Sequence, residues 1–136
     1  DAVLHEALSN FLIANLALAF CATLFRELVK DLQDQTGDAS SGARTLPLSA
    51  GVRTAKLFAW TSAAAVVGIL AYVSIFLHDF FYTWSVPVFL CAVLIPLAWA
   101  SAGLARARAP HEYRRLSLLA KWVIAAGLLL PAFIYL

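Results

Sequence analysis

The stretch LFAWTSAAAVVGILAYVSIFL, residues 57–77, contains no charged side chain. A helix rises 1.5 Å per residue, so a helix of this length spans about 30 Å, the thickness of the hydrocarbon core of a bilayer. In lipid, only a helix satisfies its own backbone hydrogen bonds along such an unbroken apolar run. We therefore predict a transmembrane helix over these residues.

Three further segments share this length and apolar character. Hydrophobic residues make up 62% of the chain and charged residues 13%, whereas typical soluble domains have about 45–50% and 25%. These values exclude a disordered tail and argue against a soluble domain. The sequence predicts an all-α membrane protein that forms a single unit over residues 1–136. Its four transmembrane helices are expected at about residues 7–25, 57–77, 82–104 and 116–136.

The ten lysine and arginine residues predict the orientation of these helices. They lie in or next to two connections, the long one at 26–56 and the short one at 105–115, and none lies in the turn 78–81. Four helices place both basic connections on one face, which the positive-inside rule makes cytoplasmic. The net charge is only +2, and the ten cations lie in two clusters rather than along one stripe. Both observations argue against a nucleic-acid partner.

The beginning of the chain indicates a piece of something longer. The sequence opens at Asp1, contains no methionine, and shows no basic region followed by a signal-peptide cleavage site. We therefore expect an internal or C-terminal piece whose functional site can be shared with a missing half.

The long connection carries the densest chemistry of the chain. Its run RELVKDLQDQTGD, residues 26–38, has four acids at successive offsets of four, three and four. On a continuous helix they fall within an arc of about 60°. We call this run the acidic segment, and its four acids are Glu27, Asp31, Asp34 and Asp38.

Neighbouring acids on one helix face repel one another, so we expect their charge to be offset. Lys30 is predicted to pair with Glu27 and Asp34, and a bound divalent cation would offset more. Carboxylates that leave room for water and phosphate oxygens are what Mg²⁺ prefers. We expect Gly37 to end the helix, so that Asp38 reaches the site from a turn. The alternative is that these are solvated charges where a helix leaves the membrane.

The acidic segment, followed by SGARTLPLSAG at residues 41–51, resembles the second aspartate-rich motif of the UbiA superfamily of intramembrane prenyltransferases. It is most similar to the digeranylgeranylglyceryl phosphate synthase branch. The matching positions are Arg26, Glu27, Lys30, Asp31, Asp34, Gly37, Asp38, Gly42, Thr45, Leu46, Pro47 and Gly51.

The resemblance implies a place within a larger fold. Members of the superfamily have nine transmembrane helices, with this motif between the sixth and seventh, so the four predicted helices resemble helices six to nine. The first aspartate-rich motif, N-D-x-x-D-x-x-x-D, is not found in the 136 residues. The chain then supplies half of a metal site, needs the N-terminal half of the enzyme as a partner, and is expected to be inactive alone.

The resemblance also implies the chemistry. In this superfamily Mg²⁺ holds the diphosphate of a polyprenyl diphosphate at the cytoplasmic face, and an acceptor attacks the prenyl group as the diphosphate leaves. In the suspected branch the acceptor is a prenylglyceryl phosphate and the product an ether lipid, made in a prokaryotic cell membrane. Catalysis and metal binding fall to Asp31, Asp34 and Asp38, and substrate phosphate binding to Arg26, Lys30 and Arg44.

Other functions remain open at this point. A related superfamily member could prenylate an aromatic quinone precursor or a haem precursor. A non-enzymatic four-helix membrane protein could carry or sense a divalent cation, although a transport path needs acidic or polar groups at mid-membrane depth and the four segments hold no carboxylate there. A structural subunit is a third alternative.

Two isolated polar residues carry weaker predictions. Asn15 lies in the first apolar segment, where an interhelical hydrogen bond is its expected role. Glu112 is expected to form a surface ion pair with Arg108 or Arg115.

Overall fold

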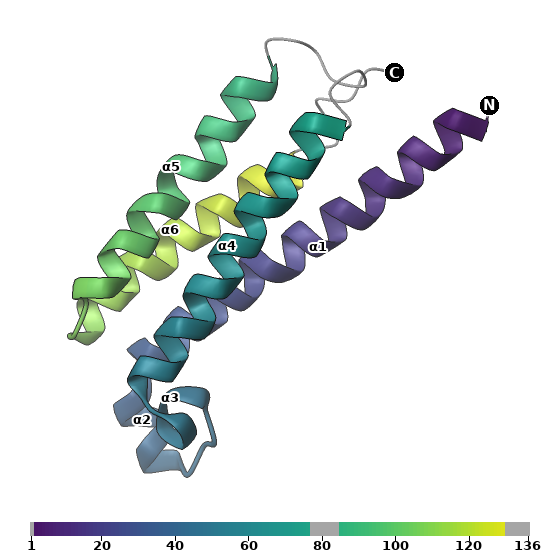
Figure 1. Cartoon of the computed structure of the whole chain (residues 1–136). Coiled ribbons are helices and arrows are strands. Elements are labelled where there is room, and N and C mark those ends of the chain that lie inside the picture. Colours follow the sequence, from purple (N-terminus) through teal and green to yellow (C-terminus); the bar gives the residue numbers. More distant parts are fainter. Residues whose placement is uncertain (1, 77–84, 130–136) are drawn as a thin grey trace.

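The computed structural model describes residues 2–76 and 85–129 of the chain. Within these ranges the chain forms helices joined by short turns, without a β-strand (Figure 1). The all-α prediction is therefore confirmed. The helices are α1 (Ala2–Gln33), α2 (Gln35–Ser41), α3 (Leu46–Ala50), α4 (Val52–Phe76), α5 (Ser85–Arg106) and α6 (Pro110–Leu128).

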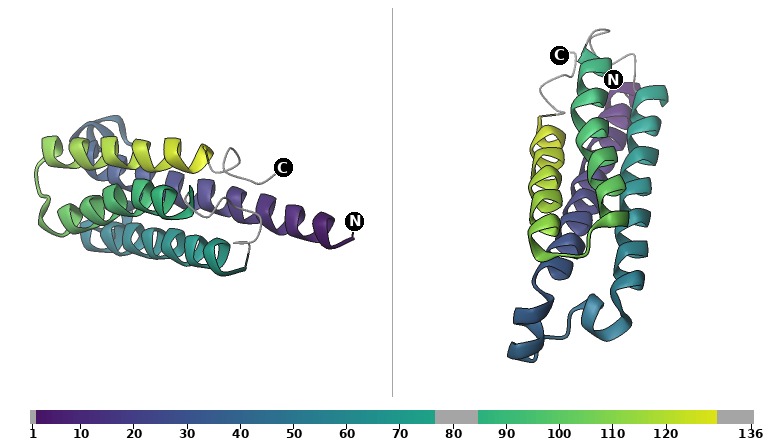
Figure 2. Two further views of the ribbon diagram at one scale, coloured as in Figure 1. Left: turned by 90° about the horizontal axis from the view of Figure 1, so that it is seen from above. Right: turned by 90° about the vertical axis from the view of Figure 1, so that its left-hand side faces the viewer.

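The four long helices alternate in direction, and the short helices α2 and α3 sit together at one end (Figures 1 and 2). Helix α1 packs on both α4 and α6, and α5 packs on α6. The first turns of α1 extend beyond its neighbours in both figures. Small and branched apolar side chains fill the space between the helices, which allows their backbones to approach closely. Fully or almost fully buried are Phe25 and Val29 of α1, Val66 and Leu70 of α4, Val93 and Leu104 of α5, and Ala120 of α6.

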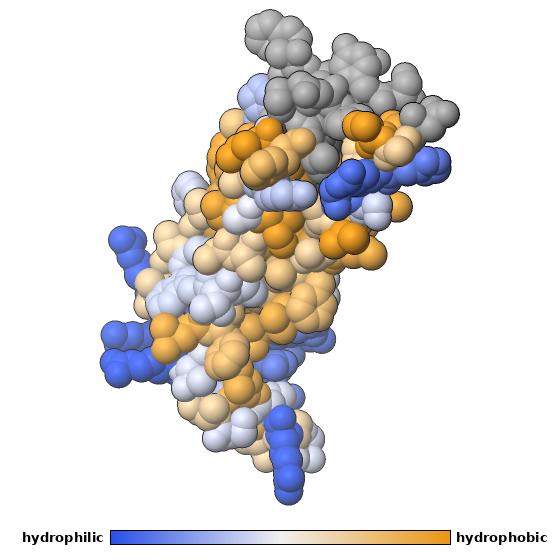
Figure 3. All heavy atoms as spheres, turned by 45° about the vertical axis from the view of Figure 1, so that its right-hand side comes forward, coloured by the Kyte–Doolittle hydropathy of each residue, from blue (hydrophilic) through white to orange (hydrophobic). Residues whose placement is uncertain are grey.

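The outer surface of the bundle is apolar, as expected for a protein that faces lipid. Leu16, Trp99 and Trp122 are each at least 70% exposed. Figure 3 shows apolar side chains across the middle of one face, with many of the hydrophilic ones projecting near the end that holds α2 and α3. In water such a surface would be an aggregation hazard, whereas in a bilayer it is solvated.

Three of the helices are long and apolar enough to cross a membrane, namely α1, α4 and the part of α5 from Pro87 to Arg106. Helix α6 does not meet this description because its 19 residues include several charges. Four membrane spans are therefore not confirmed. The predicted fourth span ends in residues 130–136, and the predicted turn 78–81 and the start of the third span also lie outside the described residues.

The connection expected as a loop at 26–56 is mostly helical. Helix α1 continues to Gln33, α2 and α3 follow, and α4 begins at Val52. The prediction that Gly37 ends a helix was wrong, because Gly37 lies inside α2. Gly42 terminates α2 instead, with φ +74°, and its N–H bonds to the carbonyl of Asp38. Glycine adopts this left-handed conformation without steric cost, so the second of the two glycines supplies the stop.

Helix α6 begins at Pro110, inside the connection predicted at 105–115. Proline suits a first helical position because the N–H that it lacks has no partner there. The Glu112 carboxylate accepts hydrogen bonds from the backbone N–H of Arg108 (2.8 Å) and of Ala109 (2.9 Å). These two bonds lower the pKa of Glu112. Glu112 is thus a helix-capping residue, and the predicted surface pair with Arg108 or Arg115 was wrong.

Candidate functional site

The acidic segment lies at the end of α1 and runs into α2. The helix is interrupted at Asp34, whose backbone has φ −94° and ψ 8°. The N–H of Asp34 bonds to the Lys30 carbonyl (3.0 Å), and the N–H of Asp38 bonds to the Asp34 carbonyl (2.9 Å). Both bonds join residues four apart, but they meet at Asp34, where α1 ends and α2 begins. Glu27 and Asp31 therefore lie on α1, Asp34 at the interruption and Asp38 on α2.

Asp31 is the centre of this charge cluster. Its carboxylate is partly buried and lies within electrostatic range of the acids at 27, 34 and 38, with Lys30 acting in the opposite sense. Like charges gathered in this way favour a bound cation, which would relieve their repulsion.

The carboxylates of the acidic segment suit Mg²⁺ only if a substrate supplies some of the ligands. In the part of the chain that the structure describes, no group of three or more His, Cys, Asp or Glu side chains is placed to hold a metal ion. Proteins commonly hold Mg²⁺ by one or two carboxylates, with waters and substrate phosphates completing the shell. Carboxylate oxygens at an open helix end suit that arrangement. Metal binding by Asp31, Asp34 and Asp38 stays a prediction.

The cations in and beside the acidic segment do not form the ion pairs that the sequence predicted. Arg26 forms an ion pair with Glu27, its neighbour in sequence. The Lys30 side chain is exposed, and among the described residues it has no ion pair with Glu27 or Asp34. That prediction was therefore wrong. Arg44 is exposed in the turn between α2 and α3, so it and Lys30 are both accessible to a ligand.

Helix α3 closes the polar end of the bundle. It packs on α1 and α4. Thr45 precedes it with an extended backbone (ψ 160°), and Pro47, in its first turn, is buried. The Thr45 hydroxyl oxygen is buried and has no hydrogen-bond partner among the described residues. A buried hydroxyl without a partner is costly, so this oxygen destabilises the start of α3 unless a water molecule reaches it.

The chain is similar to several known proteins. The chain is 51% identical over 59 residues to a protein of Methanoculleus marisnigri named digeranylgeranylglyceryl phosphate synthase. It is 34% identical over 93 residues to the protein of that name from Methanothermobacter thermautotrophicus, and 57% identical over 37 residues to that of Natronomonas pharaonis. The resemblance to digeranylgeranylglyceryl phosphate synthases is confirmed.

Each match to a digeranylgeranylglyceryl phosphate synthase is partial. The three alignments cover 41%, 68% and 27% of this chain, and 21%, 32% and 13% of the respective relatives. The chain thus matches about a third or less of the length of these synthases. No family model matches it, and no solved structure matches it.

Sequence reasoning missed a contact that fixes the polar end of the bundle. Lys56, in the first turns of α4, donates a hydrogen bond to the Ala107 carbonyl (2.7 Å) and lies 5.6 Å from the centre of the Tyr113 ring. The Tyr113 hydroxyl donates to the same carbonyl (2.9 Å). The two basic connections therefore lie at one end of the molecule, as predicted. No pattern in the sequence signals a partner 51 residues away.

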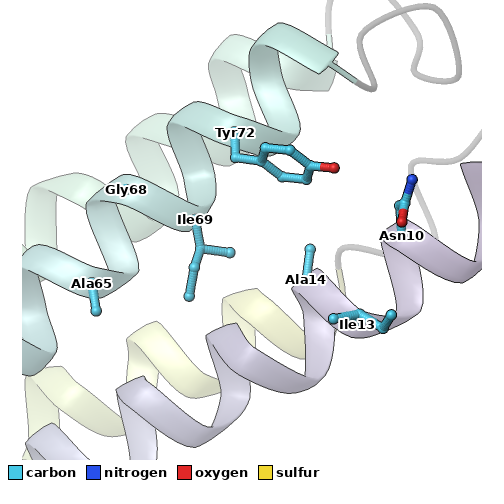
Figure 4. Close-up of a pocket in the computed structure, with 7 residues that line it drawn as sticks. All are labelled: Asn10, Ile13, Ala14, Ala65, Gly68, Ile69 and Tyr72. Atoms are coloured by element: carbon cyan, nitrogen blue, oxygen red, sulfur yellow. The ribbon is translucent and has the colours of Figure 1, made fainter.

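A groove of about 400 Å³ lies at the opposite end, between α1 and α4. Figure 4 shows Tyr72 extending from α4 across the gap on the side of Asn10 of α1. The rest of its lining is apolar or small. The side-chain nitrogen of Asn15 is buried without a hydrogen-bond partner in the described residues, so it does not form the predicted interhelical bond. The lining residues are Asn10, Ile13, Ala14, Ala65, Gly68, Ile69 and Tyr72.

Proposed function

We propose that this chain is part of an enzyme that transfers a polyprenyl group from a polyprenyl diphosphate to a prenylglyceryl phosphate in ether-lipid synthesis. The observation that carries this proposal is the similarity, up to 51% identity over 59 residues, to proteins named digeranylgeranylglyceryl phosphate synthase. The acidic segment at the polar end of an apolar helix bundle supports it. A charged headgroup and a long apolar tail require these two environments side by side.

We assign the metal to the acidic segment. Asp34 and Asp38 would contribute ligands to Mg²⁺, and Asp31 would join them once substrate phosphate oxygens and the other half of the enzyme complete the site. When bound, Mg²⁺ stabilises the negative charge that develops on a departing diphosphate. The first aspartate-rich motif of the superfamily would complete the site from the N-terminal half of the enzyme.

The cations beside the segment bind phosphate oxygens in this proposal. Lys30 and Arg44 are exposed and free to reach a ligand, and Arg26 has further N–H donors beyond the one that contacts Glu27. In the reaction the bond between the prenyl C1 and the diphosphate oxygen breaks, and its electron pair leaves with the diphosphate. The acceptor hydroxyl oxygen then bonds to C1 and transfers its proton to the departed diphosphate.

The bundle itself supplies the apolar environment. A developing allylic cation reacts with water unless water is kept away, and the apolar helix faces do this. The groove between α1 and α4 offers a further apolar wall for the prenyl tail. We assign the reaction to the cytoplasmic face, because both basic connections lie at the end that carries the acidic segment and the positive-inside rule favours that side.

The test is a transfer assay on the chain co-expressed with a segment that supplies the first aspartate-rich motif. We expect Asp34→Asn and Asp38→Asn each to reduce turnover by at least a hundredfold, because each removes a charged ligand from the metal. Glu6→Gln, the same kind of change at the opposite end of α1, serves as the control and should leave turnover unchanged. Near wild-type turnover in both aspartate variants would reject the metal assignment.

Binding measurements separate an enzyme from other cation-binding membrane proteins. Isothermal titration of Mg²⁺ into the chain should show much tighter binding when diphosphate is present, since the two ligands complete one site. Tight Mg²⁺ binding that diphosphate does not change would instead indicate a protein that carries or senses the cation. Offering aromatic acceptors beside prenylglyceryl phosphate in the transfer assay tests the acceptor class.

A further inference from the structure

A second groove, of about 430 Å³, lies on the surface between α1 and α6, and Arg26 is the only one of its lining residues that also has a role in the proposed reaction. Its lining is divided between cationic and apolar side chains. Arg26 lies seven residues before the end of α1, and Lys121 lies in the second half of α6. The remaining lining residues are Thr23 of α1 and Ile124, Ala125 and Leu128 of α6.

Lys121 is an unusual residue for its position. It falls within residues 116–136, where the rest of the segment is uncharged. Its side chain is exposed, and it has no ion pair or hydrogen bond with any described residue. A cation inside an apolar helix is costly in a membrane and is normally kept for a specific partner. The chain itself does not supply that partner in the described ranges.

The apolar side of the groove continues from this cation. Ile124, Ala125 and Leu128 follow Lys121 at offsets of three, four and seven, so they line the same face of α6. The groove therefore changes from cationic to apolar along the direction of the membrane normal. That order matches a membrane lipid, whose anionic phosphate lies at the surface and whose chains run inward.

We propose that this groove binds one anionic phospholipid of the surrounding bilayer. Its phosphate lies between Arg26 and Lys121, and one acyl chain lies against Ile124, Ala125 and Leu128. Basic sites between transmembrane helices on the cytoplasmic side bind lipid headgroups by this combination of charge and apolar contact. The site shares Arg26 with the proposed substrate-binding residues but includes none of the aspartates of the acidic segment. Substitutions at Lys121, which has no role in the proposed reaction, therefore test it separately from prenyl transfer.

Native mass spectrometry of the full chain, released from detergent micelles, measures this binding directly. The probes are phosphatidylglycerol and phosphatidylcholine with identical acyl chains. We expect phosphatidylglycerol to bind at least fivefold more tightly, and Lys121→Gln to weaken it about fivefold, the effect of one basic residue at a membrane surface. Lys121→Arg keeps the charge and should keep the binding.

Controls distinguish a specific lipid site from general attraction. Arg115→Gln removes the same charge from α6 but lies outside the groove, so it should change binding less than twofold. Inorganic phosphate at the same concentration should not displace the lipid, because it lacks a chain. Equal binding of the two lipids, or displacement of the lipid by phosphate, would overturn the proposal. So would unchanged phosphatidylglycerol binding in Lys121→Gln, or weakened binding in Lys121→Arg. A loss of binding in Arg115→Gln equal to that in Lys121→Gln would also overturn it.

Discussion

At the scale of the residue, single side chains fix the ends of helices. Glu112 shows this clearly, because its carboxylate accepts two backbone N–H groups that the start of α6 would otherwise leave unpaired. Pro110 at the first position and an acid two residues later are a recognised helix start. The pattern was readable in the sequence, but the neighbouring arginines suggested an ion pair instead.

The lowered pKa of Glu112 makes this contribution dependent on pH. The two backbone N–H groups stabilise the charged form in the folded state, so the folded pKa lies below the unfolded value of about 4.3. The stabilisation is therefore present above that value and is lost as the pH falls through the folded pKa. We expect Glu112→Ala to lower the melting temperature at pH 7, and the difference from wild type to disappear near pH 3.

Thermal unfolding in detergent, followed by circular dichroism at several pH values, measures this difference. Glu6→Ala, an exposed acid at the opposite end of the bundle, is the matched control and should show little change at either pH. A deficit in Glu112→Ala that stays constant between pH 7 and pH 3 would contradict the capping role.

At the scale of the element, two glycines five residues apart have opposite roles. Gly42 ends α2 in the left-handed conformation, whereas Gly37 lies inside that helix. A Cβ atom added at either position meets no atom within 4 Å, so space does not distinguish them. Only the backbone conformation distinguishes the two glycines.

This difference predicts opposite effects of the same substitution. Gly42→Ala should destabilise the end of α2 by about 1–2 kcal/mol, because a residue with a Cβ atom strains at positive φ. Gly37→Ala should be neutral or stabilise the helix by up to about 1 kcal/mol. Hydrogen exchange of the amides of residues 38–43 measures both. Similar protection in the two variants would show that α2 does not end at Gly42.

At the scale of the whole molecule, the bundle brings two basic connections to one end. The bond from Lys56 to the carbonyl of Ala107 establishes this for the described residues. Two helices, α4 and α5, separate the two connections, and a chain that crosses a membrane twice returns to the side from which it started. This arrangement agrees with the placement of cations in the sequence.

The orientation in the membrane can then be tested with single cysteines. In a background without Cys21 and Cys91, Arg44→Cys and Arg108→Cys should react with a membrane-impermeant thiol reagent only in inside-out vesicles. His5→Cys, at the other end of α1, should react only in right-side-out vesicles. Labelling of Arg44→Cys and Arg108→Cys from opposite sides would contradict the topology.

The sequence alone determined the helical class, the approximate apolar segments and the acidic segment with its relatives. Such features depend on composition and on spacing within one helix, which neighbouring residues fix locally. Tertiary structure decided where α2 ends, which cation pairs with Glu27, and how Lys56 reaches Ala107. It also decided that Arg26 and Lys121, 95 positions apart, line one groove. The last two features depend on which helix faces pack together, and local sequence does not encode contacts between distant segments. The end of α2 and the Arg26–Glu27 pair are local, but several glycines and acids competed for those roles.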